Sequence, residues 1–211
     1  MAKGAAYYEN ARPDVVAGLP RPLGALLDVG CGAGNVAAAA REAGATRLVG
    51  VEVVKEQAER ARAVLDRVVA LPVEDALDEL AGERFDTILC LDVLEHLVDP
   101  GAVLRRLHEV AAPGARLQVS VPNARHLSLA WDLFVRGTFN YAEHGHRDST
   151  HLRWFTRRDI VAAVADAGWR VERVSHPPLR RTRALDRLTR GRSTELTVGQ
   201  WYVLARGDDA R

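Results

Sequence analysis

The sequence predicts an α/β fold in which a parallel sheet carries helices on both faces. Short apolar runs alternate with helix-forming stretches along the first part of the chain, as they do in βαβ units. The first of these runs breaks into a loop with glycine at three alternate positions, which is typical of a tight turn between a strand and a helix. With 211 residues, 47% of them apolar and 27% charged, the chain suits one globular domain with a sizeable core.

Five strands are expected up to Pro122. Each is a short apolar run bounded by turn-forming or charged residues, and Pro72 and Pro122 close the third and the fifth. The stretches between them are rich in good helix formers such as alanine, glutamate and arginine. In chain order, the expected strands are Leu23–Val29, Arg47–Val53, Arg67–Leu71, Phe85–Leu91 and Ala115–Val121, and the expected helices are Asn35–Ala43, Lys55–Leu65 and Ala102–Ala111.

After Pro122 the regular alternation stops. The apolar positions of His126–Arg136 predict a helix, and Gly137–Phe155 reads as a polar loop rich in histidine. Thr156 is a suitable N-cap for a further helix, because an acid stands three residues later in the position of a capping box and a glycine follows the helical stretch. That helix is expected over Arg157–Ala167, with Asp159 as the acid and Gly168 as the glycine, and late strands are expected over Trp169–Ser175 and Gln200–Arg206.

Charge and cysteine content exclude several classes of protein. The net charge of +1 provides no global field for a polyanion such as DNA. Cys31 and Cys90 lie at predicted strand ends, so we expect no disulfide framework and a reduced, cytoplasmic setting. We expect no membrane span and no signal peptide, because apolar runs of the required kind are missing. Abundant alanine and arginine with little lysine are typical of a GC-rich bacterial coding sequence.

The glycine loop indicates a nucleotide-like cofactor, and the acid before it indicates which one. Gly30, Gly32 and Gly34 let the backbone turn sharply and let a ligand approach it closely. A dinucleotide's pyrophosphate requires bare amides and a helix N-terminus, and the carboxylate of Asp28 would repel it. S-adenosylmethionine has no phosphate and carries an ammonium and a sulfonium, which a carboxylate suits. The spacing also departs from G-x-G-x-x-G, since Asn35 stands where the last glycine should be.

Further acids follow the second and third strands. Glu52, eighteen residues beyond Gly34, is placed to accept both ribose hydroxyls, with Val53 directly after it. Glu74 and Asp75 follow the third strand, where a carboxylate can accept a hydrogen bond from the adenine amino group. Asp75 has an alternative role as the N-cap of a short helix.

The fourth strand leads into Leu91-Asp-Val-Leu-Glu-His-Leu-Val-Asp-Pro100. Asp92, Glu95 and His96 are spaced to share one turn of helix, where they would line the methionine end of the cofactor or pin the loop by hydrogen bonds. They also offer ligands for a hard cation, but one carboxylate pair and one histidine make an incomplete cage, so we expect no metal here.

Taken together, these motifs resemble the class I S-adenosylmethionine-dependent methyltransferases. The resemblance covers Tyr7 to about Trp169 and rests on the ordered set rather than on the loop alone. Three further segments are similar to a bacterial subgroup often associated with glycan assembly, namely Tyr7–Pro13, Val121-Pro-Asn123 followed by His126, and Asp148–Thr156. The chain departs from that subgroup at His146, Arg147 and Trp154, which lie in the expected acceptor region.

The resemblance implies a Rossmann-like sheet, mostly parallel with an antiparallel late strand, and a role for each cofactor-site residue. Glu52 would hold the ribose, and Glu74 and Asp75 the adenine. Leu91 and Asp92 would flank the sulfonium end, while Tyr8 and Arg12 would close over the cofactor, with Arg12 reaching its carboxylate. The full set of expected cofactor-site residues is Tyr8, Arg12, Asp28, Gly30, Cys31, Gly32, Gly34, Glu52, Val53, Glu74, Asp75, Leu91 and Asp92.

Histidines cluster in the segment that the resemblance assigns to the acceptor. His151 is our first candidate for the base that takes the acceptor's proton, with Asp148 or a neighbour orienting it, and His144 is the second. The competing interpretation makes Asp148, Thr150, His151 and Arg153 a hydrogen-bonded brace. A zinc site of His144, His146 and His151 lacks a clear fourth ligand and is not favoured.

The sequence therefore predicts a methyltransferase that moves a methyl group from S-adenosylmethionine to an oxygen or nitrogen of a small acceptor, with a sugar or glycan precursor suggested by resemblance. We expect one domain over residues 1–211, with an acceptor-site or lid insertion at about 123–155 and a basic segment at about 177–199. The alternatives are an RNA or protein methyltransferase that uses the arginines of 180–192, a nicotinamide-dependent oxidoreductase, and a non-enzymatic protein that binds S-adenosylmethionine.

Overall fold

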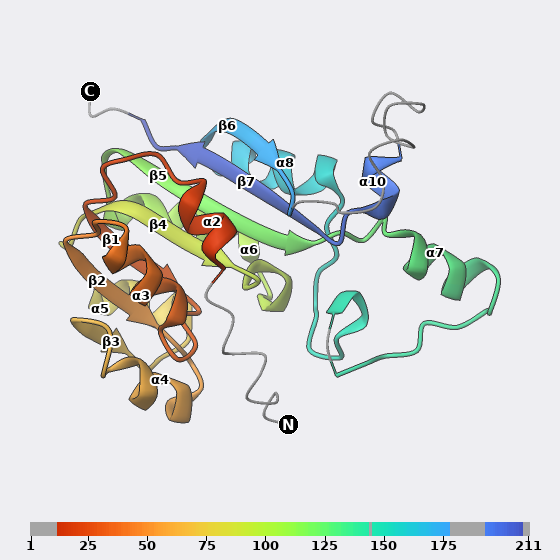
Figure 1. Ribbon diagram of the computed structural model, residues 1–211, viewed down its shortest axis with the longest axis horizontal. Coiled ribbons are helices and arrows are strands. Elements are labelled where there is room, and N and C mark those ends of the chain that lie inside the picture. Colours follow the sequence, from red (N-terminus) through yellow and green to blue (C-terminus); the bar gives the residue numbers. More distant parts are fainter. Residues whose placement is uncertain (1–11, 144, 178–192, 209–211) are drawn as a thin grey trace.

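A seven-stranded sheet forms the centre of the protein (Figure 1). The computed structural model describes residues 12–143, 145–177 and 193–208. The strand order is β3-β2-β1-β4-β5-β7-β6, and β7 runs antiparallel to both of its neighbours while the other pairs are parallel. The strands are β1 (Ala25–Val29), β2 (Arg47–Val51), β3 (Arg67–Val69), β4 (Phe85–Leu91), β5 (Ala111–Pro122), β6 (Arg170–Ser175) and β7 (Gln200–Arg206). The predicted fold class, a mostly parallel sheet with one antiparallel late strand, is confirmed.

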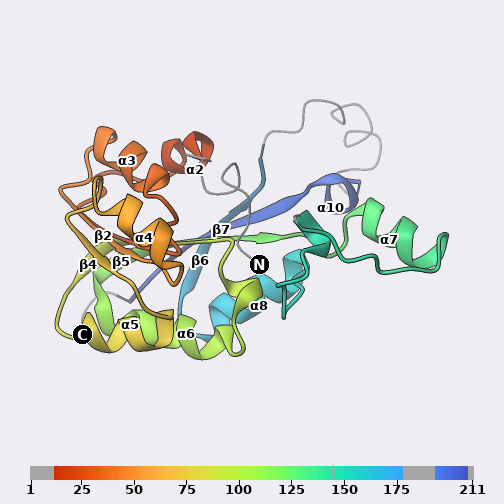
Figure 2. The same ribbon diagram turned by 90° about the horizontal axis from the view of Figure 1, so that it is seen from below.

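Helices cover both faces of this sheet (Figure 2). On one face lie α2 (Pro13–Ala17), α3 (Asn35–Glu42) and α4 (Lys55–Ala61), and on the other lie α5 (Val73–Glu79), α6 (Pro100–Arg106) and α8 (Arg157–Asp166). Neighbouring residues of β1 serve the two layers in turn: Leu26 packs into the core with α2 and α3, and Leu27 into the core with α5, α6 and α8. Both side chains are fully buried, which explains why β1 reads as a continuous apolar run.

The strand order changes direction at β1. This strand pairs with β2 on one side and with β4 on the other, and the connections leave it in opposite directions. In open α/β sheets a ligand binds beyond the carboxyl ends of the strands at such a point. The residues that follow β1, β2 and β4 are therefore gathered at one edge of the sheet.

Several element boundaries differ from the sequence-based prediction. The second and third strands end two residues early, and the fifth begins at Ala111 rather than Ala115 because the short 3-10 turn η2 (Leu107–Val110) replaces the end of the expected helix. The helix α5 was expected only in one of two interpretations, as a short helix capped by Asp75. Its N-cap is Pro72, and Asp75 is its third residue, so the interpretation of Asp75 as an N-cap is wrong.

The capping box of α8 is confirmed. The Thr156 hydroxyl accepts from the backbone N–H of Asp159, and the Asp159 carboxylate accepts from the backbone N–H of Thr156. Gly168 follows with φ +93°, the left-handed conformation that favours glycine after a helix end. Cys31 and Cys90 are both buried free thiols, as expected.

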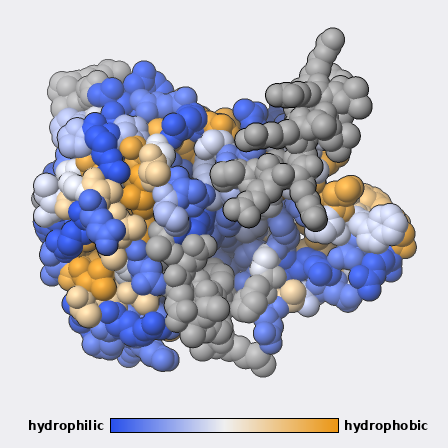
Figure 3. All heavy atoms as spheres, viewed as in Figure 1, coloured by the Kyte–Doolittle hydropathy of each residue, from blue (hydrophilic) through white to orange (hydrophobic). Residues whose placement is uncertain are grey.

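The segment after β5 leaves the sheet and carries α7 (Leu127–Phe134) and the 3-10 turn η3 (Gly145–Arg147). The short helix α10 (Thr194–Thr197), which comes later in the chain just before β7, lies in the same region (Figure 1). Asn123 ties this segment back to the body, since its side-chain amide donates to the carbonyls of Glu195 and Val198 and its backbone bridges to Phe155. The lobe that holds α7 presents apolar side chains at the surface (Figure 3), among them Trp131 and Phe134. The described part of the chain contains no helix with the length and apolar character that crossing a membrane requires.

Candidate functional site

A cavity of about 850 Å³ opens at the carboxyl edge of the sheet. It is lined by the residues that follow β1, β2 and β4, by the start of α5, and by part of the loop between α7 and α8. Most of the expected cofactor-site residues within the described chain line this cavity. They are Arg12, Asp28, Gly30, Cys31, Gly32, Glu52, Val53, Glu74, Leu91 and Asp92, whereas Gly34 and Asp75 do not line it. Tyr8 and His144 lie outside the described residues.

The glycine loop is a tight turn held against β2. The backbone N–H groups of Gly30 and Cys31 both donate to the carbonyl of Val51, at 2.8 and 3.0 Å. Gly30 has φ +74°, and a Cβ there would lie 2.5 Å from a methyl carbon of Val93, so only glycine fits. Gly34 serves the fold instead: it starts α3 with φ +88°, and a Cβ would lie 2.7 Å from a methyl carbon of Leu65.

Asp28 is a buried acid at the end of β1 with a side chain that lines the cavity. It is 2% exposed, and its Oδ2 atom has no hydrogen-bond partner among the described residues. Burial, and then the nearby charge of Glu52, raise the pKa of Asp28 to about 7. A buried acceptor without a partner is costly, so a cationic donor in the cavity would be bound strongly here.

Glu52 holds the loop and faces the same cavity. One carboxylate oxygen accepts from the backbone N–H of Gly32 at 2.9 Å, and the other accepts from that of Val54 at 2.8 Å. Because each carboxylate oxygen has two lone pairs, both can still accept a hydrogen bond from a ligand hydroxyl. The side chain is 6% exposed, so its orientation is fixed before any ligand arrives.

Asp92 joins three elements at the far side of the cavity. Its carboxylate accepts from the Ser120 hydroxyl at 2.9 Å, from the Gln200 amide at 2.8 Å and from the Arg12 guanidinium at 2.7 Å. Asp92 adopts φ +56°, which is uncommon for a residue other than glycine. Arg12 is 8% exposed, lies over the Tyr202 ring and also donates to the Gln200 amide oxygen at 3.3 Å, so in this structure it is held by Asp92 and its neighbours.

Gln200 lines the cavity, although the sequence analysis did not assign it to the site. It is the first residue of β7, the antiparallel strand. An antiparallel strand begins where its parallel neighbours end, so its first residue lies at the carboxyl edge. The expectation of an antiparallel late strand beginning at Gln200 therefore already implied that this residue lies at the edge where the cavity opens.

Polar residues from two segments also line the cavity. Asp148 accepts from the backbone N–H and the hydroxyl of Thr150, at 2.9 and 2.6 Å, and Thr150 contacts Nδ1 of His96. The rings of His96 and His151 lie edge to face with centroids 4.8 Å apart. Asp148 and Thr150 therefore form part of the expected hydrogen-bonded brace, and His151 is tied to it by its backbone N–H, which donates to the Asp148 carbonyl. The His151 side chain is 7% exposed and lines the cavity.

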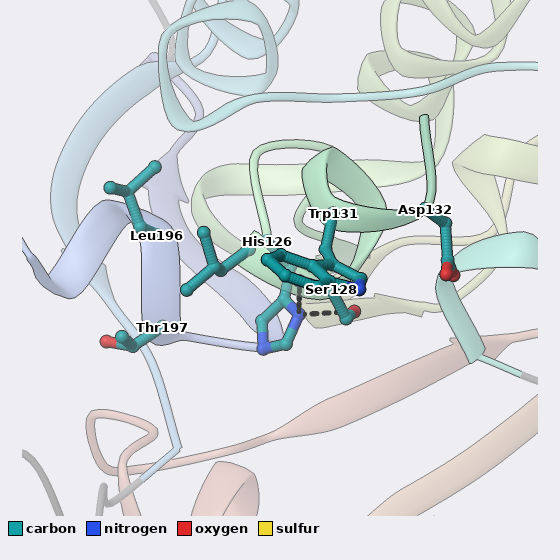
Figure 4. Close-up of a pocket in the computed structure, with 7 residues that line it drawn as sticks. His126, Ser128, Trp131, Asp132, Leu196 and Thr197 are labelled. Atoms are coloured by element: carbon teal, nitrogen blue, oxygen red, sulfur yellow. Dashed lines mark hydrogen bonds between the residues drawn. The ribbon is translucent and has the colours of Figure 1, made fainter. Parts of the chain in front are cut away.

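A second pocket of about 490 Å³ lies between α7 and α10 (Figure 4). His126 and Ser128 contribute a hydrogen bond between Nδ1 and the hydroxyl at 2.7 Å, and Trp131, Leu196 and Thr197 supply other walls. The His126 ring stacks on that of His146 at 4.7 Å, and burial lowers the pKa of both. None of the expected site residues lines this pocket.

The fold and the first cavity together define a class of protein. A glycine loop follows the central strand, a buried acid stands before it, and a second acid at the end of the next strand faces the same space. The orphaned buried oxygen of Asp28 and the glycine cradle fit S-adenosylmethionine, whose ammonium would offset the acid's charge. These are the features of a class I S-adenosylmethionine-dependent methyltransferase.

The chain belongs to the methyltransferase domain family, whose model matches residues 6–174. The ubiquinone biosynthesis O-methyltransferase of Xanthomonas axonopodis pv. citri (strain 306) is 31% identical over 172 residues, which are 78% of this chain and 70% of that protein. The protein of the same name from Xanthomonas euvesicatoria pv. vesicatoria (strain 85-10) is 30% identical over 71% of this chain and 64% of its own length. For other relatives of that name the matched part falls to 44% of their length.

A solved structure has the same fold. It is the Burkholderia thailandensis 1,6-didemethyltoxoflavin-N1-methyltransferase with bound 1,6-didemethyltoxoflavin and S-adenosylhomocysteine, with a TM-score of 0.62 and 25% identity. The match covers 95% of this chain and 80% of that one. The protein is therefore an S-adenosylmethionine-dependent methyltransferase, and the nicotinamide-dependent alternative is dropped.

The first prediction concerns the pH dependence of cofactor binding. Because the pKa of Asp28 is about 7 in the free protein, its carboxylate must lose a proton below that pH before it can pair with an ammonium. Calorimetric titration should show the affinity for S-adenosylmethionine falling about 15-fold in all from pH 7 to 5.5, with the slope approaching tenfold per pH unit at the acidic end. Asp28→Asn should bind more weakly with a flat profile, and an unchanged slope in that variant would contradict the assignment.

A second prediction concerns Glu52. Glu52→Gln keeps the shape of the side chain but removes the charge that strengthens hydrogen bonds from ribose hydroxyls, so affinity for S-adenosylmethionine should fall about tenfold or more. Glu56→Gln, an exposed acid on α4, is the matched control and should bind as the wild type does. Equal affinities for all three proteins would show that Glu52 does not face the ribose.

Proposed function

We propose that this protein methylates a hydroxyl oxygen of a small acceptor, which enters the cavity at the end lined by His96 and His151. The observation that carries the proposal is the shared cavity: His96 and His151 line the same space as Asp28 and Glu52. A histidine at that end suits an acceptor that must lose a proton as its methyl group arrives. Nitrogen is the alternative acceptor atom.

The relatives support oxygen as the acceptor atom. The curated relatives are named O-methyltransferases of ubiquinone biosynthesis, which favours a phenolic hydroxyl as the first acceptor class to try. The similarity of Asp148–Thr156 to a subgroup associated with glycan assembly favours a sugar hydroxyl as the second. An N-methyltransferase among the related structures keeps amines in the test as a third class.

Each cofactor-site residue has a proposed task. Asp28 holds the ammonium and Glu52 the ribose, and Gly30, Cys31 and Gly32 surround the methionine part, while Gly34 shapes the loop from the start of α3. Of the two acids proposed for the adenine, Glu74 lines the cavity and Asp75 does not, so we assign the adenine amino group to Glu74. Val53 lies beside the ribose position, Leu91 and Asp92 flank the sulfonium, and Arg12 with Tyr8 covers the cofactor.

The chemistry asks little of the protein beyond alignment. The bound cofactor supplies a methyl group on a cationic sulfur, which is a good leaving group. The fixed positions of Asp28 and Glu52 hold the reacting carbon in place, and alignment of this kind contributes several kcal/mol. His151 takes the acceptor's proton, with His144 as the second candidate. The segment at about 123–155 forms the acceptor side of the site within a single domain and excludes water from it.

An RNA or protein acceptor remains a separate hypothesis based on the arginines of 180–192, which lie outside the described residues. Strong binding of RNA that weakens steeply with salt would favour it. We favour a small acceptor, because the described chain offers a cavity of about 850 Å³ that the cofactor-site residues and two histidines line together.

The test of the function is an acceptor panel. Purified protein with S-adenosylmethionine is offered phenols and catechols, sugars and nucleotide sugars, and amines, and formation of S-adenosylhomocysteine is followed. We expect turnover with a hydroxyl acceptor and a product heavier by one methylene whose NMR spectrum shows a methyl ether. Methylation confined to nitrogen, or to RNA, would overturn the proposal.

A further prediction tests His151. Once an acceptor is known, His151→Ala should lower kcat about 100-fold while the affinity for S-adenosylmethionine changes less than threefold, because the residue lies at the acceptor end. His176→Ala serves as the matched control, since His176 does not line the cavity. Full activity of His151→Ala would remove this residue from the mechanism.

A further inference from the structure

Glu95, His96 and His151 come together from two segments that are far apart in sequence. Glu95 and His96 belong to the 3-10 turn η1 (Leu94–His96) after β4, and His151 belongs to the loop before α8. One ligand atom of each residue lies within 4.8 Å of the other two. All three line the 850 Å³ cavity, so the group faces the place proposed for the acceptor.

Backbone hydrogen bonds hold the two segments together. The N–H groups of Leu152 and Arg153 both donate to the carbonyl of Glu95, at 2.7 and 3.0 Å. The backbone N–H of His151 donates to the carbonyl of Asp148, which closes the turn that carries the histidine. The three side chains are therefore positioned by the backbone rather than by chance contact at a mobile surface.

The surroundings of His96 fix which ring nitrogen can bind a metal. Nδ1 lies 3.1 Å from the Thr150 carbonyl oxygen and 3.1 Å from the Thr150 hydroxyl oxygen. The hydroxyl gives its proton to Asp148 at 2.6 Å, so both oxygens near Nδ1 can only accept. Nδ1 must then carry the hydrogen, and in the neutral ring Nε2 keeps its lone pair. Metal-binding histidines commonly donate their other N–H to a carbonyl in this way.

The donor set suits a divalent transition metal. Two imidazoles and one carboxylate form the protein's part of many catalytic zinc sites and of the facial triads of iron enzymes. Glu95 is 1% exposed, and a bound cation would offset the cost of burying its charge. A metal with bonds of about 2.1 Å sets its ligand atoms roughly 3–4 Å apart, so small side-chain rotations would close the present arrangement.

We propose that Glu95, His96 and His151 bind one divalent first-row metal ion, with an open coordination position toward the acceptor. This combination differs from both sets considered from the sequence. Asp92 is occupied by Arg12, Ser120 and Gln200, and His146 contacts the Gly199 carbonyl, away from this group. The metal ligands come from segments some 55 residues apart, which local spacing alone does not bring together.

The role of the ion rests on the proposed O-methylation and changes one step of it. The ion would hold the acceptor's hydroxyl oxygen and lower its pKa, so that the proton leaves to solvent. The oxygen then forms the new O–CH3 bond, the C–S bond breaks with its electron pair passing to sulfur, and S-adenosylhomocysteine and one proton are released. In the metal-loaded protein His151 acts as a ligand, and its direct role as a base applies only to the metal-free form.

Metal binding is tested first, without acceptor or cofactor. The full chain is treated with a chelator, dialysed and titrated with Zn²⁺ by calorimetry and with Co²⁺ by its visible absorption. We expect one equivalent of each metal to bind, with the Co²⁺ spectrum of a site that contains nitrogen ligands. Absence of saturable binding near one equivalent overturns the proposal.

Variants then assign the ligands. Glu95→Gln, which keeps the side-chain shape, and His151→Ala should each weaken Zn²⁺ and Co²⁺ binding at least tenfold, with affinity for S-adenosylmethionine changed less than threefold as evidence of folding. His146→Ala is the matched control and should bind as the wild type does. Loss of binding in His146→Ala, or wild-type binding in Glu95→Gln and His151→Ala, overturns the assignment.

The activity measurement separates this inference from the proposed function. With an acceptor in hand, the metal-free enzyme should turn over at least tenfold more slowly than the same enzyme reloaded with Zn²⁺ or Co²⁺. Equal rates with and without metal would overturn the catalytic role of the ion and leave O-methylation intact. One-to-one metal binding with no methyl transfer to any hydroxyl acceptor would support the site and reject the function.

Discussion

The buried carboxylate of Asp28 at the end of the central strand is the constraint on which the site depends. It lies where the strand order changes direction, its Oδ2 atom has no partner among the described residues, and its pKa is raised to about 7. Such a group is costly in an apolar setting and stabilising only when a cation reaches it. Glu52 strengthens the effect and fixes the glycine loop through the N–H of Gly32. In the proposed site, the cofactor's ammonium would therefore gain affinity partly by relieving a charge that the fold has already desolvated.

The sequence predicted the fold well where one local pattern decides the structure. Phe85–Leu91 and Gln200–Arg206 match their strands, and the capping box at Thr156 forms as expected. Predicted boundaries were wrong where local signals compete. The end of the expected helix Ala102–Ala111 forms the 3-10 turn η2, and β5 begins four residues earlier than predicted. The start of α5 was misplaced because a proline N-cap without a side-chain hydrogen bond gives little signal.

The residues of the candidate site likewise divide into those that the sequence could predict and those that it could not. The loop from Gly30 to Gly34, the acid at the end of β1 and the acid after β2 could be found from spacing, because the topology brings strand ends to one edge. The place of Gln200 in the site and the contact between His151 and Glu95 could not be found from spacing, since each depends on a contact between segments far apart in sequence. The proposed acceptor side is built from such contacts, which explains why sequence patterns indicate the cofactor more sharply than the acceptor.

The most direct test of this account is a crystal structure of the protein with S-adenosylhomocysteine, which shares the ammonium and the ribose of the cofactor. The account predicts the ammonium within hydrogen-bond distance of the Asp28 carboxylate and both ribose hydroxyls on Glu52. The sulfur should face the end of the cavity that His151 lines. A ligand bound with its ammonium away from Asp28, or with its ribose away from Glu52, would contradict it.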